Sequence, residues 1–139
     1  MRCHLHVLLL LTLLSPLVAQ VAVVHPSVPE KAMDAKRMAA LLQGRITIWS
    51  DGTPVVLVLA QDPLADRHLS HVAGRDREIL LRGWKRLVFA GSGAMPLTAR
   101  SAEEGLALVA KTPGAVLLLD HADADPKWRV MPITLTAER

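Results

Sequence analysis

Cysteine is almost absent from this sequence, and the single residue, Cys3, lies in an apolar N-terminal stretch that we expect to be removed. Residues 20–139 contain none, so disulfides and thiolate metal sites are excluded there. The fold must then be stabilised by burial of apolar surface. This is feasible because 51% of the residues are hydrophobic and a domain of this size buries roughly two thirds of the surface of its unfolded chain.

Aromatic residues are also scarce, with three tryptophans, one phenylalanine and no tyrosine. The formal net charge is only +3, and the basic residues are spread along the chain. Nucleic-acid binding requires a denser basic stripe with exposed aromatic side chains, so the composition predicts no nucleic-acid partner. The simplest expectation for the four aromatic residues is packing in the core or at its edge: Trp49, Trp84, Phe89 and Trp128.

Catalytic motifs are missing as well. In Gly91-Ser92-Gly93 the glycines adjoin the serine and a predicted helix precedes it, which excludes a nucleophile elbow. The longer glycine pattern of a phosphate-cradling loop, with its lysine, is absent too. Two interpretations stay open: a turn that requires positive φ, or an exposed loop whose N–H groups contact an anion. The sequence therefore predicts no enzyme and no cofactor.

Metal-binding patterns are weak. His68 and His71 are three residues apart on a predicted helix, but zinc requires a third ligand, and nothing local supplies one. We expect both to face solvent. The acidic segment 120–126 (DHADADP) lacks the alternating acids, the glycine and the distal glutamate of a calcium loop. It is predicted to be a solvated turn, and no metal site is expected.

The N-terminus has the features of a secretory signal peptide over residues 1–19. Arg2 provides the positive start, residues 7–14 (VLLLLTLL) form the apolar core, and Ala19 suits cleavage. The alternative is an uncleaved anchor over residues 7–24, about the minimum length that spans a bilayer. The sequence predicts cleavage, a periplasmic or secreted location, and one domain over residues 20–139.

The remaining pattern predicts an α/β fold. Residues 55–59 are apolar at every position, which is typical of a strand covered on both faces. Ser101 and Glu104 form a capping box at a helix start. The expected strands are 21–24, 55–59, 115–119 and 128–133, and the expected helices follow Asp34, Asp62, Asp76 and Ser101.

A candidate ligand site follows from this order of elements. Asp62, Asp66 and Arg67 lie at a predicted helix start just after the 55–59 strand. Ligands of open α/β sheets collect beyond the carboxyl ends of strands, and helix N-termini attract anions. Capping and a solvent-exposed ion pair are the structural alternative. The candidate ligand-binding residues are Asp62, Asp66, Arg67, Gly91, Ser92 and Gly93.

The order of several short motifs resembles a known family. The motifs are LLQGR at 41–45, WSDG at 49–52, residues 54–58, FAG at 89–91 and TPGAV at 112–116. Together they are similar to small secreted relatives of the phosphate-binding proteins of phosphate ABC transporters, in the type II periplasmic-binding-protein superfamily. The resemblance covers residues 21–133 and implies one lobe of such a fold, with a mostly parallel or mixed sheet flanked by helices.

The chain departs from this family at the residues that, by the resemblance, would hold the anion. Full-length members hold the anion with an arginine and a serine-glycine-threonine turn after the strand matched by residues 55–58. This chain has LAQDPLAD at 59–66 and keeps none of those residues. It is also long enough for only one of the two lobes that normally enclose the ligand.

Two functions follow as expectations. The first is a non-catalytic module that binds phosphate or another small oxyanion and serves a membrane transporter or sensor. Its contacts would be backbone N–H groups near Asp62 and Gly91–Gly93, with Arg67 as charge partner. The second is a protein-interaction or sensor-accessory domain without a small ligand, which docks to a membrane protein or forms a homodimer.

Overall fold

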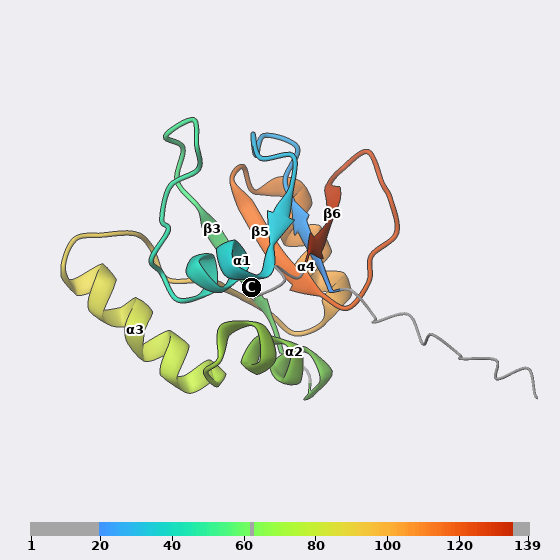
Figure 1. Ribbon diagram of the computed structural model, residues 1–139. Helices are drawn as coiled ribbons and strands as arrows, with labels where there is room; N and C mark the ends of the chain where they lie inside the picture. The colour runs from blue at the N-terminus through green and yellow to red at the C-terminus, as the bar shows by residue number, and fades with distance from the viewer. Residues whose placement is uncertain (1–19, 62, 135–139) are drawn as a thin grey trace, which may run out of the picture.

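A computed structural model describes residues 20–61 and 63–134 as a mixed six-stranded sheet with helices on both faces (Figure 1). The predicted signal peptide and Asp62 lie outside the described residues. The strands are β1 (Val21–Val24), β2 (Met33–Asp34), β3 (Val56–Ala60), β4 (Leu97–Ala99), β5 (Ala115–Leu119) and β6 (Arg129–Thr134). The helices are α1 (Ala35–Leu42), α2 (Pro63–Ala73), α3 (Arg77–Phe89) and α4 (Ala102–Lys111).

The strand order is β2-β6-β1-β5-β3-β4. β3 pairs in parallel with β4 and β5, whereas β1 is antiparallel to both of its neighbours, β5 and β6. The parallel group places the ends of β3, β4 and β5 at one edge of the sheet, which we call the carboxyl edge (Ala60, Ala99 and Leu119). The α/β class with a mixed sheet is confirmed.

Successive residues of the central strands face opposite sides of the sheet, as the pleat requires. In β3, Leu57 and Leu59 join one hydrophobic cluster, whereas Val58 and Ala60 join the other. β5 alternates in the same way and is buried throughout. The prediction that these apolar strands are covered on both faces is therefore confirmed.

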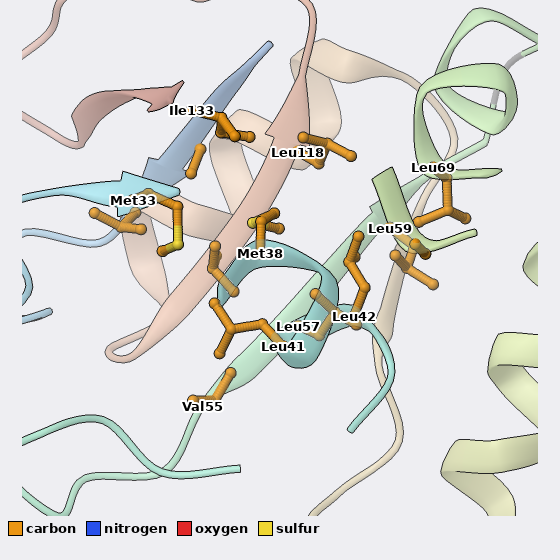
Figure 2. Packing of buried hydrophobic residues seen from close by; sticks show 14 of the residues in the cluster. Met33, Met38, Leu41, Leu42, Val55, Leu57, Leu59, Leu69, Leu118 and Ile133 are labelled. Carbon is orange, nitrogen blue, oxygen red and sulfur yellow. The ribbon is translucent and has the colours of Figure 1, made fainter. Parts of the chain in front are cut away.

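Different helices cover the two faces. On the first, α1 and α2 bring Met38, Leu41, Leu42 and Leu69 onto the sheet (Figure 2). On the second, α4 packs against β3 and β5, with Val109 fully buried. None of the helices in residues 20–61 and 63–134 has the length and apolar character needed to cross a bilayer.

The helix boundaries follow their capping residues. Asp34, Asp76 and Ser101 each accept a backbone N–H from the first turn of the helix that they precede. At α4, Glu104 reaches back to the N–H of Arg100, one residue before the expected partner. The sequence missed β2 and β4, because strands of two and three residues carry no measurable periodicity.

Replacing Ser101 with alanine is expected to lower the free energy of unfolding by about 1 kcal/mol, the usual cost of removing an N-cap hydroxyl. The Ser101 Oγ accepts the Glu104 N–H at 3.1 Å. Urea unfolding measures the change. The matched control is Ser92→Ala in the exposed turn after α3, which should stay within about 0.5 kcal/mol of wild type. Equal losses in both variants would contradict the capping role.

The aromatic side chains range from buried to exposed, and Trp128 is partly buried against the second hydrophobic cluster. Trp49 and Trp84 are 1% exposed and donate their Nε1–H to the carbonyls of Gly114 and Leu42, both at 2.9 Å. Phe89, in contrast, is 91% exposed, so its predicted packing role was wrong. Phe89 is the last residue of α3, and it lies beyond Leu80 and Trp84, the residues that this helix buries in the core.

Ile79 on α3 is a second difference from the sequence pattern. The spacing of Ile79, Leu80, Gly83, Trp84 and Leu87 predicts that all five lie on one apolar helix face, but Ile79 is 44% exposed. At about 100° per residue, Ile79 points well away from Trp84 around the helix axis. α3 therefore buries a narrower stripe than its sequence indicated.

Candidate ligand site at the carboxyl edge

The first described feature of the site is the exit of β3. The Gln61 N–H donates to the Ala99 carbonyl at 2.7 Å, which holds the exit of β3 against β4. α2 begins at Pro63, directly after this point. The positive end of its helix dipole therefore lies at the carboxyl edge, the arrangement that the sequence predicted.

Arg77 from the start of α3 provides the cation at this edge. Its Nη2 donates to the Ala60 carbonyl, and its Nε donates to Asp66 Oδ1 at 2.7 Å. Its Nη1 is buried and has no hydrogen-bond partner within the described part of the chain. A buried guanidinium N–H without a partner is costly, so this group favours a water or ligand oxygen beside it.

A small cavity at this edge has Arg77 in its lining. Its volume is about 10 Å³, and it is lined by Val58, Leu59, Ala60, Ala65, Leu69, Arg77 and Leu118. This is about the space that one water molecule needs. An oxyanion of several heavy atoms does not fit inside, so it would have to bind outside the cavity, at the Arg77 guanidinium with which Asp66 now pairs.

The ion pair between Asp66 and Arg77 is only a weak obstacle to the binding of an anion at Arg77. The Asp66 side chain is 51% exposed and that of Arg77 is 18% exposed. Pairs with one partner in solvent typically contribute about 0–1 kcal/mol, because water screens the charges and ordering the side chains costs entropy. An anion of higher charge can therefore compete with Asp66 for Arg77.

Asp120 adds a second negative charge to the same edge, directly after β5. Burial opposes ionisation of its carboxyl, but hydrogen bonds from the His121 side chain and backbone N–H outweigh this effect and hold the pKa of Asp120 below its ordinary value. Asp120 is therefore ionised at neutral pH. The carboxyl edge carries acidic groups beside its arginine, which weakens any anion binding there.

The predicted site residues form two separate groups. Asp66 reaches Arg77 at the start of α3, and Arg67 is exposed on α2. The 91–93 turn follows the other end of α3, roughly 18 Å away along the helix axis. Both glycines in that turn have positive φ, +81° and +74°, as a turn at this place requires, and contact of its N–H groups with an anion stays a prediction.

Arg77 is the site residue that sequence reasoning missed. It is eleven residues beyond Asp66, and the α2–α3 connection folds it back onto the end of β3. No local spacing rule contains this contact. The sequence predicted Arg67 as the charge partner instead, because it is adjacent to Asp66 in the chain.

The two histidines of α2 have different surroundings. His68 is half-buried, and its Nδ1 lies 2.6 Å from Gln20 Nε2, so the expectation that it faces solvent was wrong. His71 is exposed, as expected. No group of three or more potential metal ligands occurs within residues 20–61 and 63–134.

No protein-family model and no curated protein matches the sequence. Solved structures do match the fold. One is described as a phosphate ABC transporter substrate-binding protein with bound phosphate, from Clostridium perfringens, with a TM-score of 0.60 at 16% identity. Another is an ABC-type phosphate transport receptor from Vibrio cholerae, with a TM-score of 0.58 at 14% identity. PstS from Borrelia burgdorferi has a TM-score of 0.54 at 9% identity.

These matches cover 85%, 86% and 87% of this chain, but only 46%, 47% and 48% of the respective solved chains. The chain thus spans about half the length of each solved protein, as the one-lobe interpretation requires. At these identities the likeness concerns the fold. The protein therefore has the fold of one lobe of the phosphate-type substrate-binding proteins.

Proposed function

We propose that the protein is a non-catalytic, exported solute-binding-like module whose ligand is phosphate or a similar small oxyanion. Arg77 carries the proposal, because it places a guanidinium with an unpartnered Nη1 at the carboxyl edge, beside the start of α2. The likeness to phosphate receptors supports the same ligand class. The proposal includes removal of residues 1–19 as a signal peptide and service to a membrane transporter or sensor.

Binding proceeds by exchange at Arg77. The oxyanion takes the place of the Asp66 carboxylate, and the guanidinium donates charge-assisted hydrogen bonds to it. A single lobe leaves much of the ligand in water, so the interaction lacks the burial that enclosed pockets provide. We expect a dissociation constant on the order of 1 mM, equivalent to about −4 kcal/mol.

Calorimetric titration of residues 20–139 with phosphate tests this exchange. Replacing Asp66 with asparagine removes the competing charge and should tighten binding about tenfold, a gain of roughly 1.4 kcal/mol. Arg77→Gln should abolish binding. The control Arg82→Gln changes an arginine of the same helix that pairs with the exposed Glu78, and it should bind like wild type.

Thermal unfolding of each variant establishes that it is folded before titration. Absence of heat from Asp66→Asn at 10-fold the expected dissociation constant would refute the oxyanion proposal. Unchanged binding by folded Arg77→Gln would refute the assignment of the site.

A docking role is the second candidate, and one observation favours it. Phe89 is almost fully exposed at the end of α3, preceded by the exposed Lys85 and Arg86. Aromatic and arginine side chains are enriched at the energetic centres of protein interfaces. Two results together would support docking to a second copy. Titration with phosphate would give no heat, and sedimentation would show a dimer that Phe89→Ser dissociates.

A further inference from the structure

A basic groove lies along the outer side of α1, separate from the carboxyl-edge site at Arg77. Its volume is about 300 Å³, within the range of small-molecule sites. It is lined by Asp34, Lys36, Arg37, Ala40, Arg45 and Ile46. Neither the sequence motifs nor the proposed function assigns any role to it.

The chain reversal after α1 builds the groove. Gly44 has φ +72°, and the N–H groups of Arg45 and Ile46 both donate to the Ala40 carbonyl, at 2.9 and 3.3 Å. The backbone of Arg45 is thereby held at the carbonyl of Ala40, and Lys36 lies one helical turn before Ala40 on α1. Lys36 and Arg45 line the groove together with the apolar residues Ala40 and Ile46.

Three of the charged groups here, Asp34, Arg37 and Glu30, already have hydrogen-bond partners. The Asp34 carboxylate accepts the Arg37 N–H at 2.6 Å as the cap of α1. The Arg37 guanidinium donates to Glu30 Oε1 at 3.0 Å, and the Ser50 N–H donates to the same oxygen at 2.9 Å. The Glu30 side chain is only 7% exposed, so Arg37 is held firmly in place.

The other two cations are available. Lys36 and Arg45 are exposed, and neither makes an ion pair with any residue that the structure describes. Two like charges that line one groove repel each other, and an anion that bridges them would relieve this repulsion. The arginine can donate two parallel hydrogen bonds to one oxyanion group, and the lysine can hold the other.

We propose that the basic groove binds a small anion with two oxyanion groups on a short spacer, such as a di- or tricarboxylate or a diphosphate. Lys36 holds one group, Arg45 holds the other, and Ala40 and Ile46 contact the spacer. An anion with only one charged group can engage one cation at a time and binds much more weakly.

Titration calorimetry with citrate and with pyrophosphate tests the groove, and acetate is the single-charge control. Wild type should bind at least one of the two multivalent anions with a dissociation constant below 1 mM, and acetate should give no heat; the preferred anion identifies the spacer chemistry. Lys36→Gln and Arg45→Gln should each weaken binding at least fivefold. Lys111→Gln, which removes an exposed cation on α4, should change nothing.

Absence of heat from wild type with both anions would overturn the proposal, as would loss of binding in only one of the two groove variants. Arg77→Gln separates this site from the carboxyl edge. It should leave citrate or pyrophosphate binding intact, and if it abolishes that binding, the anion occupies the carboxyl edge and the groove assignment is wrong.

Discussion

Replacing Gly114 with alanine is expected to destabilise the protein by about 4 kcal/mol, a large part of the 5–15 kcal/mol that typically separates folded from unfolded proteins. Gly114 has φ +78°, and an added Cβ would lie 2.4 Å from the Pro54 carbonyl oxygen. That oxygen belongs to the backbone and cannot rotate away, so the segments that lead into β3 and β5 must move apart. Positive φ alone costs an alanine roughly 1–2 kcal/mol.

The same movement would also weaken three hydrogen bonds of Gly114. The Gly114 carbonyl accepts from Val56 N–H at 3.0 Å and from Trp49 Nε1–H at 2.9 Å, and the Gly114 N–H donates to Ser27 Oγ at 3.1 Å. Each contributes about 1 kcal/mol. Urea unfolding at 25 °C measures the total loss.

Gly52→Ala is the matched control for this prediction. Gly52 has a similar φ of +83°, but nothing lies within 4 Å of the added Cβ. Only the backbone term remains, so the expected loss is about 1–2 kcal/mol. Equal losses at the two glycines would show that the contact with Pro54 is relieved without cost.

Trp84→Ala is expected to cost about 3–5 kcal/mol, the range observed for deleting a buried aromatic side chain. Trp84 fills the space between α3 and the end of α1. A Cβ added to Gly44 would lie 3.5 Å from the Trp84 ring. The deletion also removes the donor to the Leu42 carbonyl. Chemical unfolding followed by circular dichroism measures the change. Circular dichroism is preferred to tryptophan fluorescence because the variant lacks one of the three tryptophans.

Phe89→Ala provides an aromatic control on the same helix. Because Phe89 is 91% exposed, its truncation should change the free energy of unfolding by less than about 0.5 kcal/mol. A loss comparable to that of Trp84→Ala would mean that the end of α3 packs against the rest of the molecule, contrary to the fold described above.

Local signals predicted most of the fold. The uninterrupted apolar run 115–119 became β5 with the same bounds, and Asp34, Asp76 and Ser101 begin helices as expected. The position of β1 was not predictable. Its neighbours, β5 and β6, come from the far end of the chain, and four apolar residues carry no information about which strands will flank them.

The candidate sites were less predictable because they depend on contacts between distant segments. Asp66 was identified from its place after a strand, but Arg77 reaches it only through the α2–α3 connection. The basic groove depends on the backbone reversal at Gly44, which brings Arg45 back onto α1. The exposure of Phe89 could not be inferred either, since an isolated aromatic residue at a helix end is compatible with both packing and solvent.

The central place of β1 also constrains how the polypeptide can fold during synthesis. Val21 pairs with Leu119 on one side and with Pro132 on the other, so the middle of the sheet cannot close until nearly the whole chain has left the ribosome. Pairing of such distant segments is entropically slow. We therefore expect the nascent chain to stay open until most of it has been synthesised.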